Sequence, residues 1–220
     1  MYLITTLGFD EKFQVRSVMR HGNELEKVVI VKPKDDNEKA RKALENFQEL
    51  LNRLGIPNEV LEIDVNDFTN AVVSIAKKVF KMKDKKIVVN ISGGMRALIV
   101  ELISTFLITG IMAEFELETE DFKSLITFSS LDIKYGNLGT DELNILLAVK
   151  RGFNTVNKVK NYLNIPLTTA WRRIKKLESE GCITRKDDKL SLTVRGTILS
   201  EIYESLEKDH ENLSRKMKAG

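Results

Sequence analysis

The feature that most constrains the fold of this 220-residue chain is a regular alternation of short apolar segments with longer amphipathic ones over the first 130 residues. The short segments have the length and β-branched composition of strands, and the longer ones are typical of helices. The predicted strands are 2–6, 27–33, 59–65, 86–92, 113–118 and 125–130, and the predicted helices lie within 7–22, 38–55, 69–82 and 96–110. Strands that alternate with helices require crossover connections. The pattern therefore predicts an α/β, Rossmann-like domain with a mostly parallel sheet covered by helices on both faces.

The longest apolar run of the chain, residues 97–113, is interrupted by Glu101 and by hydroxyl residues. It is short for a membrane-spanning helix, so we expect a fully buried helix and no membrane association. The single cysteine, Cys182, cannot form an internal disulfide, and the N-terminus shows no basic stretch before its apolar residues. These observations favour a cytoplasmic protein.

The segment NISGGMRAL, residues 90–98, places two glycines where a predicted strand meets a predicted helix. Glycines 93 and 94 permit positive φ angles and leave room above the backbone, and a helix that begins at about Met95 or Arg96 presents unpaired amides at its positive end. Such an end is suited to an anion. Ser92 adds a hydroxyl, Arg96 adds a charged fork for phosphate, and Asn90 could orient the loop or contact a base.

Residues 6–9, Thr-Leu-Gly-Phe, follow the first predicted strand and form a second loop of suitable composition. In open parallel sheets, ligands bind beyond the carboxyl ends of the strands, at the point where the strand order reverses. Both loops therefore qualify by composition as ligand loops at that point. The alternative is a tight turn that needs no ligand. Neither loop has the G-x-G-x-x-G pattern of dinucleotide-binding folds or the phosphate-binding loop of nucleotide triphosphatases.

The second part of the chain is basic. From Thr140 onward there are 16 Lys and Arg against 11 Asp and Glu, a net charge of about +5, whereas the first 139 residues have a net charge of about −2. Between Lys150 and Arg195 the count is 12 against 4. A basic block confined to one part of the chain favours a polyanionic partner at that part.

The pattern of this second part predicts three helices followed by a hairpin. A helix starts at Thr140, Asn154 or Thr155 caps a second one, and Ile165-Pro166 makes the turn into a third helix, 167–181; two short strands then lie within 182–193. In the first part, Asp67 is likewise placed to cap the helix that follows it. Three helices and a hairpin are typical of a winged helix-turn-helix DNA-binding domain.

Helical spacing places Ala170, Ile174 and Leu177 of the third helix inward and predicts a polar stripe on the opposite face. The residues predicted to contact DNA on this helix are Thr168, Thr169, Arg172, Arg173 and Lys176, and those on the hairpin are Arg185, Lys186 and Lys189. Hydroxyl and cationic groups are the donors that phosphates and guanine edges accept from. Trp171 flanks the apolar face, so we interpret it as a core or domain-contact residue in preference to a base-stacking one.

Taken together, T-T-L-G-F after the first strand, N-I-S-G-G-M-R-A-L after the fourth and a C-terminal winged helix resemble the CRISPR-associated Rossmann fold (CARF) transcriptional regulators of archaea. The resemblance covers nearly the whole chain and implies a CARF sensing domain at 1–135, a linker at 136–139 and a winged helix-turn-helix domain at 140–220. It also implies a two-fold homodimer that binds one cyclic oligoadenylate, typically cyclic tetra-adenylate. The residues that match the family's ligand loops are Thr6, Leu7, Gly8, Phe9, Asn90, Ser92, Gly93, Gly94, Met95 and Arg96. The apolar helix 97–109 would then help to bury the dimer interface.

The function that this resemblance implies is regulation of transcription in a CRISPR system, and hence antiviral defence. A bound ring would change the separation of two DNA-contacting helices and thereby the affinity for two-fold half-sites of double-stranded DNA. We expect no enzymatic activity, no cofactor besides the ring effector and no metal. The alternatives are a ring-cleaving nuclease that uses Ser92 and Arg96, and a repressor that senses a dinucleotide. Arg16 and His21 formally match the Arg-x4–6-His spacing of the ribonuclease domains found on some CARF proteins, a match that we attribute to chance because both lie in the first predicted helix.

The segment 197–217 repeats apolar residues at helical spacing. It is expected either to pair with its counterpart in a dimer or to pack on its own domain, and the sequence leaves both options open.

Overall fold

A computed structural model describes residues 1–34, 37–133 and 138–205. The chain divides into two compact units, residues 1–130 and 131–220, which are considered one at a time. This division falls a few residues before the predicted boundary at 135. Leu131 belongs with the second unit, where its carbonyl oxygen lies 3.4 Å from Nη1 of Arg195. Residues 136 and 137 of the predicted linker, 136–139, lie outside the described residues.

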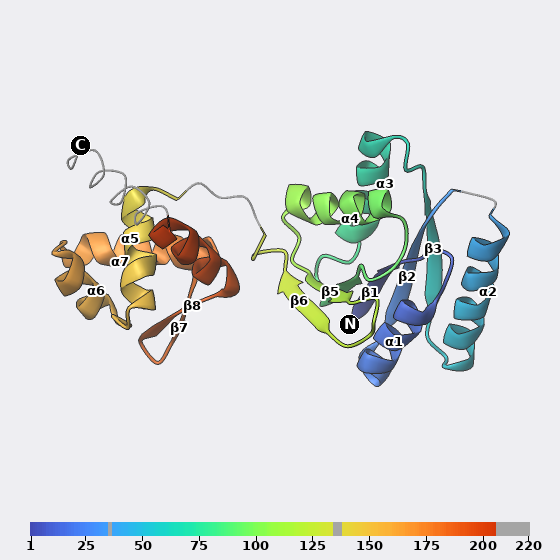
Figure 1. Ribbon diagram of the computed structural model, residues 1–220, viewed down its shortest axis with the longest axis horizontal. Helices are drawn as coiled ribbons and strands as arrows, with labels where there is room; N and C mark the ends of the chain where they lie inside the picture. The colour runs from blue at the N-terminus through green and yellow to red at the C-terminus, as the bar shows by residue number, and fades with distance from the viewer. Residues whose placement is uncertain (35–36, 134–137, 206–220) are drawn as a thin grey trace, which may run out of the picture. The chain divides into compact units, whose positions relative to one another are not determined.

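The first unit is a six-stranded sheet with helices between its strands (Figure 1). Its strands are β1 (Tyr2–Thr6), β2 (Lys27–Pro33), β3 (Asn58–Ile63), β4 (Ile87–Asn90), β5 (Glu114–Glu118) and β6 (Leu125–Ser129), in the spatial order β3-β2-β1-β4-β5-β6. The helices are α1 (Lys12–His21), the 3₁₀ helix η1 (Gly22–Glu24), α2 (Glu38–Arg53), α3 (Phe68–Phe80) and α4 (Arg96–Thr109). Every neighbouring pair of strands is parallel except β5 and β6, which are antiparallel. The predicted mostly parallel Rossmann-like fold is confirmed.

Alternate residues of the central strands supply two separate cores. On β2, Val28 and Ile30 pack with α1 and α2, whereas Val29 and Val31 face the other core, with α3 and α4. All four side chains are fully buried, so β2 is apolar on both faces, as a central parallel strand requires. Figure 1 shows α3 and α4 on one side of the sheet and α1 and α2 on the other.

A charged network joins α1 to β5 within this unit. Glu118, 3% exposed, accepts hydrogen bonds from Nε of Arg16 at 2.6 Å and Nη1 of Arg20 at 3.0 Å. The carboxylate of Glu116 accepts a hydrogen bond from Nη2 of Arg20 at 3.2 Å and lies 2.7 Å from Nε2 of His21. Arg16 and His21, the pair that matches ribonuclease spacing, thus contact carboxylates of the sheet, which gives both residues a structural role.

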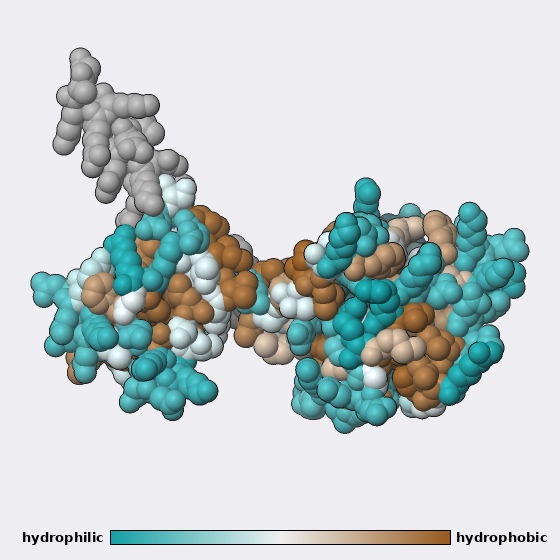
Figure 2. Space-filling model, turned by 60° about the horizontal axis from the view of Figure 1, so that its bottom comes forward, coloured by the Kyte–Doolittle hydropathy of each residue, from teal (hydrophilic) through white to brown (hydrophobic). Residues whose placement is uncertain are grey.

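The prediction that the apolar run 97–113 forms a fully buried helix is wrong. The side of α4 that carries Leu102 packs on the sheet, but Val100, Leu107 and Ile108 are exposed on the outside, Ile108 to 70%. The reason is that α4 has one sheet to cover, and no described segment of the chain covers its outer face. Figure 2 shows that other apolar patches also remain among the hydrophilic residues of the surface. Within the described residues, no helix is both long and apolar enough to cross a membrane.

The second unit begins with three helices and a hairpin. They are α5 (Thr140–Lys150), α6 (Val156–Leu163), α7 (Leu167–Ser179), β7 (Ile183–Lys186) and β8 (Lys189–Leu192). A three-residue turn joins α6 to α7, and Asn164 closes α6 in the left-handed conformation (φ 50°). Asp187 and Asp188, both with positive φ, make the two-residue hairpin turn. This arrangement is compatible with the predicted winged helix-turn-helix.

A further helix begins at residue 194 and continues to 205, where the described residues end. Its first turn approaches the start of the hairpin so closely that a Cβ on Gly196 would lie 2.0 Å from the carbonyl oxygen of Cys182. Leu199 packs against the core of this unit. The described start of the C-terminal segment therefore packs on its own domain, and the remainder of 197–217 lies outside the described residues.

Replacing Glu118 by Gln is expected to lower the free energy of unfolding at pH 7 by about 1–3 kcal/mol, because it removes a buried acceptor charge from two arginines. The hydrogen bond from Arg16 lowers the pKa of Glu118. A carboxylate whose pKa is lower in the folded state stabilises the fold above its unfolded pKa, and this contribution is lost as the pH falls through the folded value. The difference between wild type and variant should therefore shrink below about pH 4.5 in urea unfolding.

The matched control is Glu49→Gln, which removes the carboxylate of an exposed helical pair with Arg53 and is expected to change stability little at any pH. If Glu118→Gln lowers the free energy of unfolding by the same amount at pH 7 and in acid, the ionised carboxylate has no such role.

Candidate functional site

Two regions hold the residues that the sequence predicts to be functional. One lies at the carboxyl edge of the sheet in the first unit, and the other lies on α6, α7 and the hairpin of the second unit.

The strand order reverses between β1 and β4. From β1 the chain proceeds outward to β2 and β3, whereas β4 and β5 lie on the opposite side. The loops that follow β1 and β4 therefore leave neighbouring strands at the same edge of the sheet. Both loops of the predicted ligand site thus lie at the reversal point.

The two loops are held together by backbone contacts. The hydroxyl of Thr6 donates a hydrogen bond to the carbonyl oxygen of Gly93. A Cβ on Gly8 would lie 3.1 Å from Cα of Gly94, and a Cβ on Gly94 would lie 2.9 Å from Cβ of Thr6. Gly94 also has a φ of +94°, which side chains rarely adopt. Glycine at 94 is thus required both by its conformation and by the close approach of the first loop.

Buried polar groups fix the shape of the second loop. Oδ1 of Asn90 accepts a hydrogen bond from the amide of Ser92 at 3.2 Å, and Oγ of Ser92 accepts one from the amide of Glu118 at 2.8 Å. Asn90 is fully buried and orients the loop, which is the first of its two predicted roles. Because Oδ1 faces a donor, Nδ2 points elsewhere, and it has no acceptor within the described part of the chain.

Gln14 of α1 is a supporting residue that the sequence analysis missed. It is fully buried, and its Nε2 donates to the carbonyl oxygen of Thr6. The same nitrogen would lie 3.0 Å from a Cβ on Gly93, so Gln14 lies beside both loops. A usable signal was present in the sequence, because Gln14 and Ser17 place two polar residues on the side of α1 that faces the sheet.

The predicted ligand residues separate into buried and exposed groups. Leu7 is 1% exposed and packs in the core, which favours a packing role for its side chain. Phe9 and Met95 are exposed, Phe9 to 61%. Arg96 is exposed at the first position of α4, whose start has no side-chain cap. Among the described residues, Arg96 has no hydrogen-bond or ion-pair partner, so its guanidinium and the first amides of α4 are open to an anion.

Beside these loops lies a shallow pocket of about 320 Å³, between the start of α1 and the turn from β5 to β6. The ring of Phe122 lies 5.0 Å from that of Phe13 and 5.2 Å from the guanidinium carbon of Arg16. Phe13 is in turn close to the second loop, 3.3 Å from a Cβ on Gly93. An aromatic, partly cationic surface thus adjoins the glycine loop.

In the second unit, two cations of the predicted polar stripe of α7 form ion pairs within the unit. Arg173 pairs with Asp141, and Nζ of Lys176 lies 3.2 Å from Oε1 of Glu142, so both face the first turn of α5. Burial raises the pKa of Glu142, but the hydrogen bond from Lys176, a backbone hydrogen bond and the charges of Lys176 and Arg173 together outweigh burial, so the pKa is lowered. Thr169 is only partly exposed.

A second exposed row of α7 lies one residue from the predicted stripe, at i, i+3, i+4 and i+7. It consists of Thr168, Trp171, Arg172 and Lys175, and Lys176 beside it is exposed as well. Nζ of Lys175 lies 5.8 Å from the centre of the Trp171 ring and 3.2 Å from a carboxylate oxygen of Glu178. Arg172 has no partner within the described residues. Lys175 is a second residue that the sequence analysis missed.

On the hairpin, one of the three cations predicted to contact DNA is paired within the unit. Nε of Arg185 lies 2.8 Å from Oε1 of Glu178, and this side chain is mostly covered. Lys186 and Lys189 are exposed without ion-pair partners among the described residues, and they flank the acidic turn.

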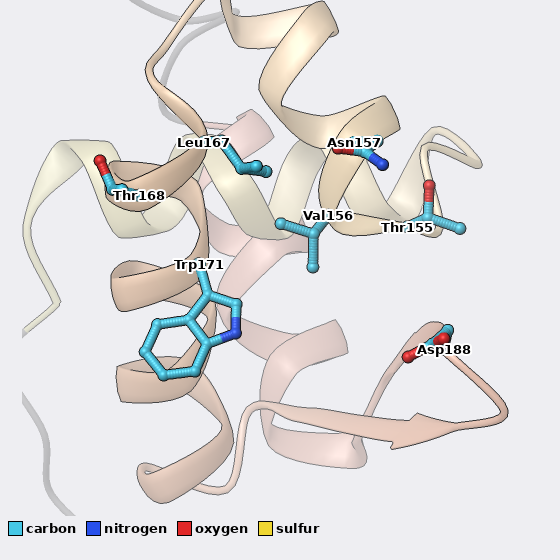
Figure 3. A pocket seen from close by; sticks show the side chains of 7 residues that line it. All are labelled: Thr155, Val156, Asn157, Leu167, Thr168, Trp171 and Asp188. Atoms are coloured by element: carbon cyan, nitrogen blue, oxygen red, sulfur yellow. The ribbon is translucent and has the colours of Figure 1, made fainter.

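A groove of about 620 Å³ lies between the starts of α6 and α7 and the hairpin turn (Figure 3). Its lining residues are Thr155, Val156, Asn157, Leu167, Thr168, Trp171 and Asp188. Trp171 is 50% exposed and lines this groove, so the interpretation of Trp171 as a core residue is wrong.

Comparison with known proteins gives two family matches on this chain. Residues 1–129 match the Csa3 CRISPR-associated Rossmann-like domain, and residues 139–208 match the N-terminal domain of the methanogenesis regulatory protein FilR1. No curated protein matches the chain.

Several solved structures are similar at low sequence identity. Can2 from Sulfobacillus thermosulfidooxidans, in complex with cyclic tetra-adenylate, is 10% identical with a TM-score of 0.47, over 99% of this chain and 68% of that one. VC1899 from Vibrio cholerae is 11% identical with a TM-score of 0.44, over 90% of this chain and 64% of that one. Csm6 from Enterococcus italicus, bound to cyclic hexa-2′-fluoro-hexa-dAMP, is 11% identical with a TM-score of 0.44, over 94% of this chain and 77% of that one.

Replacing Gly94 by Ala is expected to lower the free energy of unfolding by about 2–4 kcal/mol, because the new Cβ meets Thr6 at a disfavoured φ. The control is Gly110→Ala, where φ is +67° but nothing lies within 4 Å of a Cβ, so only the conformational cost of about 1 kcal/mol remains. Chemical denaturation of both variants measures the difference. Equal losses in the two would mean that the contact between the loops contributes nothing.

Proposed function

Through residues 1–129 the chain belongs to the Csa3 CRISPR-associated Rossmann-like domain family, and on that premise we propose that it is a ligand-responsive transcriptional regulator of a CRISPR system. The observation that carries this proposal is the presence of two matches on one chain, a Rossmann-like domain of that family and a regulatory domain at 139–208. The first unit senses the ligand and the second binds double-stranded DNA.

The proposed effector is a cyclic oligoadenylate, with cyclic tetra-adenylate as the first candidate. Its phosphates are anionic, and the uncapped start of α4 with the unpaired guanidinium of Arg96 supplies a dipole end and a fixed charge for them. The partnerless Nδ2 of Asn90 adds a donor beneath the loop. The chemistry therefore supports an anionic ligand, and the family resemblance supports a ring of adenylates.

A homodimer completes the proposed site. The exposed apolar residues of α4, Val100, Leu107 and Ile108, lie at i, i+7 and i+8 and so share one side of the helix. A second copy packed there by two-fold symmetry would bury these side chains. Two starts of α4 would then face one symmetric ring, each contributing an arginine.

The first turn of α5 is the proposed link to the DNA-contacting helix. Asp141 and Glu142 follow directly on the segment that joins the two units, and they hold Arg173 and Lys176 of α7. A shift of that segment would thus be passed to α7 through two ion pairs. A changed spacing of two α7 helices in a dimer changes the affinity for two-fold half-sites.

We propose binding without cleavage for the ring. Ser92, which the ring-cleavage alternative would use, already accepts a hydrogen bond from the amide of Glu118 and thereby connects the loop to β5. This contact supports a positioning role for its hydroxyl.

Replacing Arg96 by Ala is expected to weaken binding of cyclic tetra-adenylate at least about tenfold, because a charge-assisted bond to phosphate is lost. The affinity of ligand-free protein for DNA should stay unchanged. Calorimetry measures both the affinity and the ratio of one ring to two chains, with linear tetra-adenylate, cyclic hexa-adenylate and NADH as comparison ligands.

The matched control for this experiment is Arg41→Ala, which removes an exposed arginine from α2, outside the candidate site. Equal ring affinity in wild type and Arg96→Ala would exclude the phosphate role. Binding of NADH in preference to any ring would favour the dinucleotide alternative.

Replacing Arg172 by Ala is expected to weaken DNA binding, because one phosphate contact is lost. The slope of the logarithm of the association constant against the logarithm of the salt concentration should fall in magnitude by about one. Arg173→Ala is the matched comparison and should change the slope less, since its guanidinium already pairs with Asp141. Fluorescence anisotropy with a duplex selected from a random library gives both slopes. An unchanged slope in Arg172→Ala would mean that this side of α7 faces solvent in the complex.

A further inference from the structure

We propose that the groove between α6, α7 and the hairpin turn recognises thymine in the major groove of DNA, and that Trp171 is the specificity-determining residue that contacts its 5-methyl group. This inference rests on the proposed DNA-binding function and goes beyond it, because it assigns sequence selectivity to a side chain outside the cationic set.

The charge of the groove argues against a phosphate inside it. None of its seven lining residues is a cation, and Asp188 contributes a carboxylate. A phosphodiester in this groove would therefore be repelled without a compensating charge. The unpaired cations lie next to the lining in sequence instead, with Arg172 after Trp171 and with Lys186 and Lys189 on either side of the hairpin turn. This distribution places DNA phosphates at the rim and base edges in the groove.

The lining of the groove matches what a thymine-adenine pair presents. Leu167 and Trp171 lie one helical turn apart on α7, and both are about half exposed, with Val156 of α6 beside them in the groove. The thymine methyl is the apolar group of the major groove, and apolar side chains recognise it by contact. Figure 3 shows the indole on one side of the groove and Asp188 on the other. A carboxylate there can accept from an exocyclic amino group, such as that of the paired adenine.

A cation also lies near the face of the indole in the free protein. Nζ of Lys175, one turn further along α7, lies 5.8 Å from the centre of the ring. Such a cation–π contact, which is weak at an exposed site, favours one orientation of a ring that is otherwise half exposed. A ring with restricted motion loses less conformational entropy on contact, which suits a recognition residue.

The test compares thymine with deoxyuridine, which lacks only the 5-methyl group. A duplex is first selected from a random library with the full chain, and a second duplex is made with deoxyuridine in place of every thymine. Wild type should bind the deoxyuridine duplex at least about four-fold more weakly, the loss expected for one buried methyl group. Trp171→Ala should bind both duplexes equally, whereas Trp171→Leu, which keeps an apolar side chain, should retain part of the preference.

Ile198→Ala is the matched control, since it truncates a half-exposed apolar side chain of the same unit outside the groove, and it should keep the full preference. Trp171 is the single tryptophan of the chain, so its fluorescence gives a second readout without any substitution. Acrylamide should quench this emission less in the DNA complex than in free protein. Thermal unfolding verifies that each variant is folded.

Four outcomes would each overturn the inference while DNA binding itself stands. Wild type binds both duplexes equally, or Trp171→Ala keeps the preference for the thymine duplex. Alternatively, the selected duplex contains no thymine, or acrylamide quenches the emission of Trp171 equally in free protein and in the DNA complex. Failure of wild type to bind any duplex would overturn the proposed function and this inference together.

Discussion

The contact between the loops after β1 and β4 is the constraint on which the rest of the first unit depends. The hydroxyl of Thr6 donates a hydrogen bond to the carbonyl oxygen of Gly93, and the backbones of Gly8 and Gly94 lie in close contact. Because these loops leave adjacent strands at the reversal point, their contact fixes where α4 begins. A helix start that is fixed in position presents its amides and Arg96 in one geometry, which is what recognition of an anion requires.

The fold was largely predictable because its signals are local. Alternating strand and helix patterns and β-branched central strands each specify an element within a few residues, and both predicted polar caps are observed. Asp67 accepts a hydrogen bond from the amide of Asn70, and Thr155 accepts one from that of Lys158. The two ligand loops could also be located, since the strand order of such sheets follows from their connections.

The details that the sequence did not reveal depend on contacts between distant segments. Helical spacing identifies the inward side of α7, but it does not reveal that Asp141 and Glu142 of α5 hold Arg173 and Lys176. These pairs engage two cations of the predicted stripe, whereas Trp171 and Lys175 lie in the exposed row beside it. The partly buried acceptor Glu178 similarly engages Arg185 of the hairpin. In each case a carboxylate elsewhere in the fold decides whether a cation is already paired within the unit.

The placement of α4 gives a physical reason why ligand binding and dimer geometry should be coupled in the proposed regulator. One end of this helix is the uncapped start at the loops, its inner side packs on the sheet through Leu102 and Phe106, and its outer side exposes apolar residues. A packed helix moves largely as a rigid body, so a ligand that draws its start toward a symmetric centre also displaces its outer side. If that outer side is the dimer contact, the same displacement changes how two copies meet. No separate pathway between ligand and partner chain is then needed, because a single helix carries both contacts.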